Sequence, residues 1–345
     1  MTGVRCILPG LFVALSAASG FASAQSLDTL AEEALSLGDT TSVMVQQAGE
    51  VVAEAHSGRM HADRATNIKS ASKSIMGLLV GIAIREGYLD GVDQPIGPFF
   101  PDYFSGNPEP AKEAITIGDL LSMRSGLEST SRRNYGAWVV SDSWVDYALS
   151  QPLVTRPGEQ RIYSTGNTHL LSAILTEATS MSVKAFAERY LFNPMDIDVG
   201  GWDRDPQGYY FGGNNMALSP RSLLKIGELV LDQGRYGGEQ LVPAAWIETS
   251  LGRYTRSRYN PYFYGYLWWQ HQLNGYDIQF AWGNGGQYIM VIPALQAVLA
   301  ITAASDVPGG ATSRGGRQQL FQLLGERLFP LLERRLNDSV DGAGY

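Results

Sequence analysis

The sequence predicts a mixed α/β fold of the α+β type, with one antiparallel sheet built from both ends of the chain, flanked by terminal helices and carrying an inserted all-helical lobe. Strand patterns near the N-terminus, a long helical middle and a return of strand patterns before the C-terminal end support this prediction. The 345 residues exceed the ~250–300 at which a single core stops growing. We therefore expect a sheet lobe of about residues 25–69 and 262–345, and a helical lobe of about residues 70–261.

Each element follows from a local pattern. An amphipathic pattern predicts a helix over Ser26–Leu37, and a glycine turn at Ala48-Gly49-Glu50 predicts a hairpin of Ser42–Gln47 and Val51–Ala55. Helical signals run from Ser70 to about Leu251. The later elements are strands at Tyr266–His271, Tyr276–Trp282, Tyr288–Ile292 and Val298–Thr302, an Asn274-Gly275 turn, and a final helix over Arg314–Leu336.

Residues 1–24 have the pattern of an export signal. Arg5 precedes an apolar run, Ile7–Phe21, which ends in the small residues Ala22-Ser23-Ala24 that a signal peptidase reads. We expect cleavage before Gln25, giving a periplasmic or secreted protein. The alternative is a retained membrane anchor, although the run is short for a span of ~20 residues. No later stretch is long enough to cross a bilayer, so the mature protein is expected to have no stable membrane span.

Composition and motif searches exclude several functional classes. The chain is 44% hydrophobic with a net charge of −8, which excludes a disordered chain, and its acidic pI near 5.1 disfavours nucleic acid as a partner. The four histidines are scattered without an H-E-x-x-H pair, so no metal site is expected. P-loop, Rossmann and Gly-x-Ser-x-Gly patterns are also missing, and no cofactor is expected.

Ser-x-x-Lys is the pattern that remains. Residues three apart share a helix face, so the lysine amine can reach the serine hydroxyl, and a lysine whose pKa is lowered by burial can act as a base. The sequence holds two such pairs, Ser70/Lys73 and Ser222/Lys225. The second follows Ser219-Pro220, a helix start, and reads as an ordinary amphipathic helix. Ser70 instead opens a strongly apolar run, and this context favours the first pair.

Four segments in this order resemble the serine β-lactamase and penicillin-binding-protein superfamily. The resemblance is to its class C-like branch of family VIII carboxylesterases and 6-aminohexanoate-dimer hydrolases. The four segments are Ser70-Ala71-Ser72-Lys73, Ile115–Leu127 (ITIGDLLSMRSGL), Pro157-Gly158 with Tyr163–Thr168 (YSTGNT), and Gly283–Gln287 (GNGGQ) followed by Pro293. They span roughly Thr41 to Ala304, and the resemblance implies a β-lactamase-like fold.

The resemblance also implies catalytic roles. Ser70 would form an acyl-enzyme with an ester or amide, Lys73 would take its proton, and Tyr163 would exchange protons with the leaving group and water. Such a tyrosine can work if nearby positive charge favours its phenolate. Backbone N–H groups of Ser70 and Asn284 would form the oxyanion hole. Further substrate-binding candidates are Tyr135, Asn167, Trp282, Gly283 and Gly285. Trp138 is a candidate either for the pocket or for the core.

Two departures from the family pattern bear on the substrate. Position 165 is Thr where many β-lactamases have the asparagine of Tyr-x-Asn, and Ala281-Trp282-Gly283 stands where Lys-Thr-Gly would bind a β-lactam carboxylate. These departures disfavour penicillin hydrolysis and leave ester or amide hydrolysis, so with the export signal we expect an exported serine hydrolase acting on small esters or amides. The alternatives are a β-lactamase or D,D-peptidase acting on cell-wall peptides, and a non-catalytic homologue that senses a ligand.

Overall fold

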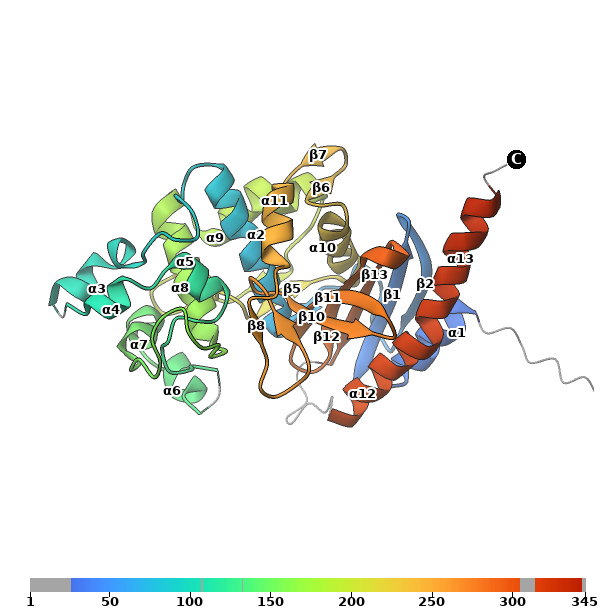
Figure 1. Ribbon diagram of the computed structural model, residues 1–345, viewed down its shortest axis with the longest axis horizontal. Helices are drawn as coiled ribbons and strands as arrows, with labels where there is room; N and C mark the ends of the chain where they lie inside the picture. The colour runs from blue at the N-terminus through green and yellow to red at the C-terminus, as the bar shows by residue number, and fades with distance from the viewer. Residues whose placement is uncertain (1–25, 107, 132, 305–313, 343–345) are drawn as a thin grey trace, which may run out of the picture.

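The computed structural model describes residues 26–106, 108–131, 133–304 and 314–342. Its main feature is an eight-stranded sheet in the order β2-β1-β13-β12-β11-β10-β9-β8, in which the strands from the two ends of the chain meet where β1 pairs antiparallel with β13 (Figure 1). This arrangement confirms the predicted fold class. The predicted signal segment, residues 1–24, lies outside the described residues.

The N-terminal strands form the predicted hairpin. Helix α1 (Leu27–Leu35) begins after Ser26, whose hydroxyl accepts a hydrogen bond from the Thr29 N–H. Strands β1 (Thr40–Gln47) and β2 (Glu50–His56) are joined by Ala48 and Gly49, both with positive φ (50° and 82°). Positive φ at both central residues is typical of a type I′ hairpin turn, whose backbone twist agrees with the twist of the flanking strands.

The C-terminal strands follow the prediction with one correction. Strands β8 and β9 are short, and the longer strands are β10, β11, β12 and β13; the Asn274-Gly275 turn joins β10 to β11. The bounds are β8 Thr255–Arg256, β9 Phe263–Tyr264, β10 Trp269–Leu273, β11 Tyr276–Gly283, β12 Gln287–Ile292 and β13 Ala297–Ala303. The predicted strand from Tyr266 is wrong at its start, because Leu267 has φ 65° and donates its N–H to the Leu121 carbonyl instead of a neighbouring strand.

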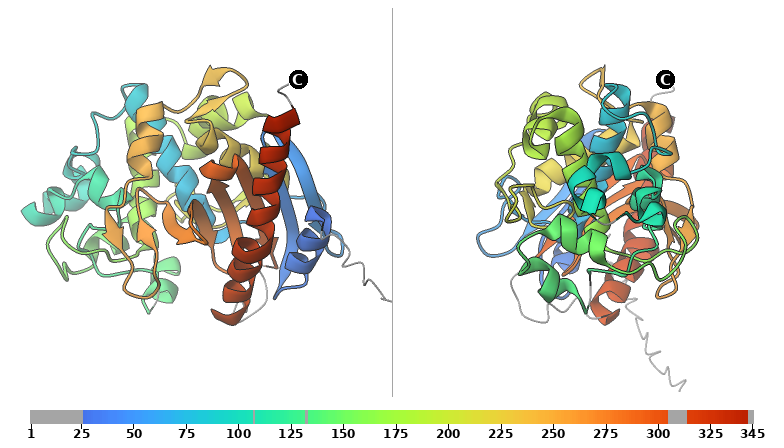
Figure 2. Two further views of the ribbon diagram at one scale, coloured as in Figure 1. Left: turned by 45° about the vertical axis from the view of Figure 1, so that its right-hand side comes forward. Right: turned by 90° about the vertical axis from the view of Figure 1, so that its left-hand side faces the viewer.

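Helices cover both faces of the sheet (Figure 2). On one face lie α1 and the C-terminal helices α12 (Arg314–Leu323) and α13 (Phe329–Gly342), which a π-helical turn at Leu324–Leu328 joins. The final helix is therefore longer than predicted. On the other face lies α10 (Pro220–Leu231), where a side chain at Gly227 would come within 2.2 Å of Val298. Although α10 falls in the range that we assigned to the helical lobe, it packs on the sheet.

The remaining helices form the lobe at the other end of the molecule (Figure 1). Helix α2 (Ser72–Arg85) lies between this lobe and the sheet, in contact with both α8 and β11, and is buried over nearly its whole length (Figure 1). The other helices are α3 Pro101–Gly106, α4 Pro110–Glu113, α5 Ile117–Leu121, α6 Tyr135–Val139, α7 Trp144–Ser150, α8 Thr165–Thr179, α9 Val183–Ala187 and α11 Ala244–Ser250. A small three-stranded sheet consists of β3 Thr66–Asn67, β5 Met216–Leu218 and β4 Gly201–Trp202. The short hairpin of β6 Arg235–Tyr236 and β7 Glu239–Gln240 follows α10 and contacts it.

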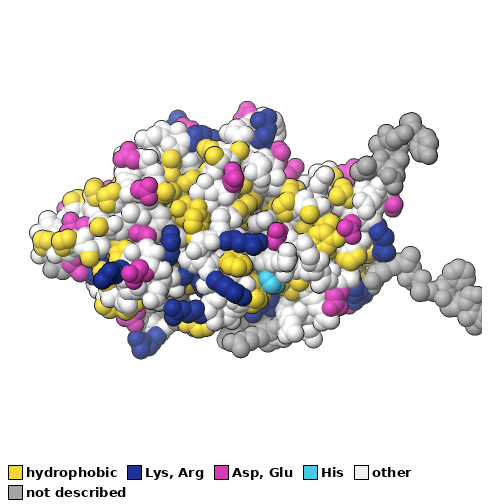
Figure 3. Space-filling model, in the orientation of Figure 1, with side chains coloured by type: hydrophobic (Ala, Val, Ile, Leu, Met, Phe, Trp, Pro, Cys, Tyr) yellow, Lys and Arg dark blue, Asp and Glu magenta, His cyan; other side chains and the backbone are white. Residues whose placement is uncertain are grey.

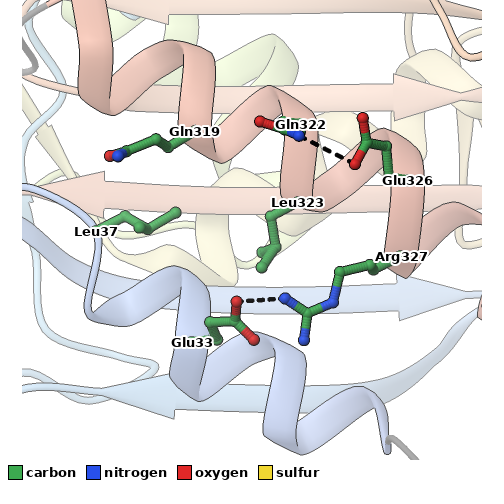
Figure 4. Close-up of a pocket in the computed structure, with 7 residues that line it drawn as sticks. All are labelled: Glu33, Leu37, Gln319, Gln322, Leu323, Glu326 and Arg327. Atoms are coloured by element: carbon green, nitrogen blue, oxygen red, sulfur yellow. Dashed lines mark hydrogen bonds and ion pairs between the residues drawn. The ribbon is translucent and has the colours of Figure 1, made fainter.

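The surface is mixed in charge: acidic and basic side chains are interspersed on the face shown in Figure 3. A hollow between α1 and α12 (Figure 4) is bounded by Glu33 and Arg327, which form an ion pair; it lies on the sheet face opposite α10. Among the described helices, none has the length and apolar character needed to cross a bilayer.

Candidate active site

Ser70 lies at the entrance to α2, as the sequence predicts. It is the middle residue of a 3₁₀ turn, Lys69–Ala71, that leads directly into the helix. Lys69 has φ 50°, an uncommon value for a residue with a side chain, and its N–H donates to the side-chain oxygen of Asn67 at 2.9 Å. Backbone in sparsely populated conformations is often found next to reacting groups. Ser70 is only partly buried, unlike Ala71 and Ser72, which follow it.

Lys73 is a buried amine in contact with that hydroxyl. Its side chain is 1% exposed, and Nζ lies 3.2 Å from Ser70 Oγ and donates to the Gly213 carbonyl at 2.5 Å. Burial lowers the pKa of Lys73 from 10.5 to about 7, because the ammonium form loses its hydration. Near neutral pH, a large fraction of the amine is therefore unprotonated and able to accept a proton from Ser70.

Tyr163 completes the cluster from the residues just before α8. The centre of its ring lies 5.4 Å from Lys73 Nζ, and its hydroxyl is close enough to Ser70 for the serine to influence its pKa. Burial raises the pKa of Tyr163 to about 12, against the opposing effects of the nearby Ser70 hydroxyl and the Arg161 charge. Desolvation therefore outweighs the nearby positive charge, which is the condition on which a phenolate would depend. At neutral pH the tyrosine is a phenol and can donate a proton.

An aromatic row continues from Tyr163 towards Trp282. Tyr163 stacks on Trp269, with ring centres 6.1 Å apart, and Trp269 meets Trp282 edge-on at 5.5 Å. The Arg161 guanidinium lies 5.1 Å from the Trp269 ring and Arg317 lies 4.7 Å from the Trp282 ring. Trp282, a predicted substrate-binding residue, thus lies in the same row as Tyr163.

The glycine-rich segment ends β11 beside the Ser70 turn. Gly283 pairs with Gln287, and a side chain at Gly283 would come within 2.2 Å of the Ile68 carbonyl. Only glycine lets this strand end approach the segment before Ser70 so closely. Asn284 is exposed in the following turn, and Gly285 has φ +90°. The oxyanion roles of Ser70 and Asn284 remain predictions.

Two other predicted site residues, Tyr135 and Asn167, form hydrogen bonds with neighbouring side chains. Tyr135 accepts a hydrogen bond from Asn214 Nδ2 at 3.1 Å, and Asn214 adjoins Gly213, the partner of Lys73. Asn167 is buried, but its side-chain oxygen accepts from Ser125 at 3.0 Å instead of facing Lys73. Tyr135 is therefore linked to the residue next to the Lys73 partner, whereas the side-chain oxygen of Asn167 is engaged by Ser125. Their substrate-binding roles remain predictions.

The second Ser-x-x-Lys pair is structural. Lys225 Nζ donates to the carbonyls of Met195 and Asp196 at 2.9 and 2.6 Å, and Ser222 pairs with the capping Ser219 at 2.9 Å. Trp138, left open between pocket and core, is fully buried with its indole N–H bound to the Trp144 carbonyl, so it belongs to the core.

A comparison with known families agrees with this geometry. The family model described as Beta-lactamase matches residues 37–324, which is most of the chain. The chain belongs to the Beta-lactamase family. The match contains the Ser70 turn, the residues before α8 and the end of β11.

Other comparisons show what this Beta-lactamase family chain is similar to. A 6-aminohexanoate-dimer hydrolase of Paenarthrobacter ureafaciens is 24% identical over 229 residues, or 61% of this chain and 57% of that protein. A putative 6-aminohexanoate-dimer hydrolase from Bacillus anthracis shares the fold (TM-score 0.70, 16% identity, 86% of this chain and 81% of that one). EstCE1, a hydrolase with promiscuous acyltransferase activity, also shares the fold (TM-score 0.69, 16% identity, covering 86% of this chain and 97% of that one).

Sequence reasoning missed several residues of this Beta-lactamase family site. Gly213 and Asn214 belong to a run of turn-forming residues, Gly212–Asn215, that could have been noticed as a segment needing special backbone conformations. Trp269 carries only a strand signal in the sequence, and His169 is one of four scattered histidines. Asp205, the hydrogen-bond partner of His169, carries no sequence signal.

Proposed function

We propose that this chain is an exported serine hydrolase that cleaves small esters or amides through an acyl-enzyme on Ser70. The observation that carries the proposal is the buried Lys73 amine, with a pKa of about 7, within hydrogen-bonding distance of Ser70 Oγ. A serine hydroxyl is a weak nucleophile until a neighbouring base accepts its proton. Lys73 supplies that base without a histidine.

The proposed reaction has two halves. Ser70 Oγ bonds to the substrate carbonyl carbon while neutral Lys73 takes its proton, and the N–H groups of Ser70 and Asn284 stabilise the oxyanion. Tyr163, a phenol at neutral pH, donates a proton to the departing alcohol or amine as its bond to the carbonyl carbon breaks, and regains one from the Lys73 ammonium. Water then attacks the acyl-enzyme by the reverse of these transfers, releasing the acid and Ser70.

Two features support esters or linear amides over β-lactams. Ala281-Trp282-Gly283 offers no cation where Lys-Thr-Gly would hold a carboxylate, and the half-buried Trp282 ring, packed against the buried Trp269, belongs to the aromatic row that begins at Tyr163. The relatives named as 6-aminohexanoate-dimer hydrolases lend support to an amide. A β-lactamase or D,D-peptidase is the second candidate because the matching family model is described as Beta-lactamase.

Hydrolysis of p-nitrophenyl acetate and butyrate tests the proposal. We expect Ser70→Ala to lose at least about a thousandfold in kcat/KM, whereas Ser222→Ala, the serine of the structural Ser-x-x-Lys pair, should match the wild type. A fluorophosphonate probe should label the wild type and Ser222→Ala but not Ser70→Ala. Equal ester hydrolysis by wild type and Ser70→Ala would refute the assignment, and absence of both labelling and turnover would favour a ligand sensor.

Two further measurements address the finer claims. Turnover of nitrocefin at a rate comparable to the esters would favour the β-lactamase alternative. Export is tested by expression in a Gram-negative host with fractionation of the cells, where we expect a periplasmic product that begins at Gln25. A product that keeps residues 1–24 and sediments with membranes would contradict cleavage and favour an anchor.

A further inference from the structure

A buried histidine–aspartate pair lies behind the Lys73 site. His169, on α8, and Asp205 both have side chains with no exposed surface, and Nε2 lies 2.8 Å from Oδ2. The second carboxylate oxygen accepts the Tyr209 N–H at 2.8 Å. Buried ionisable side chains are rare unless they are paired, and the proposed Ser70 chemistry does not use this pair directly.

The hydrogen bonds of the ring define where its proton lies. The Gly212 N–H donates to His169 Nδ1 at 3.3 Å, and a ring nitrogen that accepts a hydrogen bond carries no hydrogen. The proton is therefore on Nε2, which donates it to Asp205. Asp205 thus selects the tautomer, as the second partner of a histidine commonly does. The rings of Trp138, Trp144 and Phe211 surround the imidazole and fix its plane.

His169 is linked to Lys73 through two glycines. The Gly212 N–H is bound to His169, the Gly212 carbonyl accepts from Thr168 Oγ1 at 2.7 Å, and the Gly213 carbonyl accepts from Lys73 Nζ at 2.5 Å. A side chain at Gly212 would come within 2.0 Å of the Thr168 carbonyl, and one at Gly213 within 2.5 Å of Lys73 Cγ. The peptide that faces the lysine is therefore held on both sides in a tightly packed position.

We propose that His169 and Asp205 are positioning residues for Lys73. The pair anchors the Gly212–Gly213 turn, so that the Gly213 carbonyl takes one N–H of the amine and leaves the lone pair directed at Ser70 Oγ. This inference rests on the proposed function, because it assigns the pair a role in the base that activates Ser70. Correct orientation of a base within a fraction of an ångström has large effects on rate.

Two amide substitutions separate the two hydrogen bonds of the ring. In His169→Asn, the side-chain oxygen stands where Nδ1 stands and can still accept the Gly212 N–H. In His169→Gln, the amide reaches the place of Nε2 and can donate to Asp205, but the Gly212 N–H loses its acceptor. We expect His169→Asn to stay within about threefold of wild-type kcat/KM per folded protein, and His169→Gln to lose tenfold or more.

The pH profile provides a readout that loss of stability alone would not change. Without the Gly213 carbonyl in place, the Lys73 ammonium loses a stabilising acceptor, so the acidic limb of kcat/KM should move to lower pH in His169→Gln and stay in place in His169→Asn. If His169→Gln does not fold, Asp205→Asn takes its place in the test. With its amide oxygen kept on the Tyr209 N–H, its NH2 group faces His169 Nε2 and forces the ring proton onto Nδ1, so the Gly212 N–H loses its acceptor. Asp205→Asn should therefore give the same tenfold loss and the same shift.

Ser172→Ala is the matched control. Ser172 lies one turn further along α8, is fully buried, and donates to the Tyr210 carbonyl at 2.6 Å, so its loss also weakens the contact of α8 with this segment without touching Gly212. We expect lower stability with unchanged kcat/KM. Equal kcat/KM for the Asn and Gln variants, an unmoved limb in the Gln variant, or an equal loss in Ser172→Ala would overturn the inference. Ester hydrolysis surviving in Ser70→Ala would instead refute the proposed function.

Discussion

Replacing Lys73 by methionine should make the protein more stable while abolishing its activity. The pKa of Lys73 falls from 10.5 to about 7 on folding, and one pKa unit corresponds to about 1.4 kcal/mol, so keeping the ammonium buried costs about 5 kcal/mol at low pH. At pH 7, where about half of the folded chains have lost this proton and the unfolded chain keeps it, about 4 kcal/mol of that cost remains. Methionine fills a similar volume without the charge.

The gain is reduced by the hydrogen bonds that methionine cannot make. The Gly213 carbonyl loses its donor, and an unsatisfied buried polar group costs about 1–3 kcal/mol. We therefore expect Lys73→Met to raise the free energy of unfolding at pH 7 by about 1–3 kcal/mol. Between pH 7 and 10.5 the unfolded chain binds a proton that the folded chain lacks, so wild-type stability rises relative to Lys73→Met, and by pH 10 the lysine cost shrinks to about 1 kcal/mol.

Urea unfolding of both proteins at pH 7 and pH 10 measures this difference, because the other titrating groups are shared and cancel. Lys225→Met is the control: its amine also binds carbonyls, but it is partly exposed, so its loss should give no gain in stability. The reasoning is refuted if Lys73→Met is less stable than wild type at pH 7. It is also refuted if the difference between the two proteins stays constant as the pH rises.

Three further predictions concern activity and the Gly213 turn. The kcat/KM for p-nitrophenyl acetate should fall about tenfold per pH unit below an apparent pKa near 7, since only neutral Lys73 accepts the Ser70 proton; a flat profile down to pH 5 would contradict this. Tyr163→Phe should lower kcat by about 10²–10⁴-fold with little change in thermal midpoint. Gly213 has φ +88° and no room for a methyl group, so Gly213→Ala should lower the free energy of unfolding in urea by about 2–5 kcal/mol and also reduce activity. Gly58 has φ +61° but open space around it, so Gly58→Ala should lower the free energy of unfolding by only about 1–2 kcal/mol.

The sheet was predictable because its signals are local. Alternation of apolar residues and turns of the Asn274-Gly275 kind specify strands and hairpins over a few residues each, and β1, β2, β11, β12 and β13 follow them closely. The errors arise from tertiary contacts. Leu267 leaves the extended conformation because its N–H binds the Leu121 carbonyl, which lies far away in sequence. The amphipathic pattern of α10 specifies a buried face but not which surface covers it.

The same distinction applies to the site. The choice of Ser70/Lys73 over Ser222/Lys225 was possible because an apolar run around one lysine predicts its burial, and burial is what lowers its pKa. The second partner of Lys73 was not predictable, since Gly213 lies 140 positions away and contributes only a backbone carbonyl. No residue type marks a carbonyl in a sequence.

The choice of a carbonyl as that partner has a chemical consequence. A carboxylate beside Lys73 would favour the ammonium and raise its pKa, leaving no lone pair for Ser70 at neutral pH. The groups that the structure places around the amine are the Ser70 hydroxyl, the Gly213 carbonyl and the Tyr163 ring, all uncharged at neutral pH. Desolvation therefore acts almost unopposed, and Asp205, the buried carboxylate of this region, is kept from the lysine by the His169 ring and the Gly212–Gly213 turn. Asp205 thus anchors the Gly212–Gly213 turn through the His169 ring, and the imidazole separates its carboxylate from the Lys73 amine.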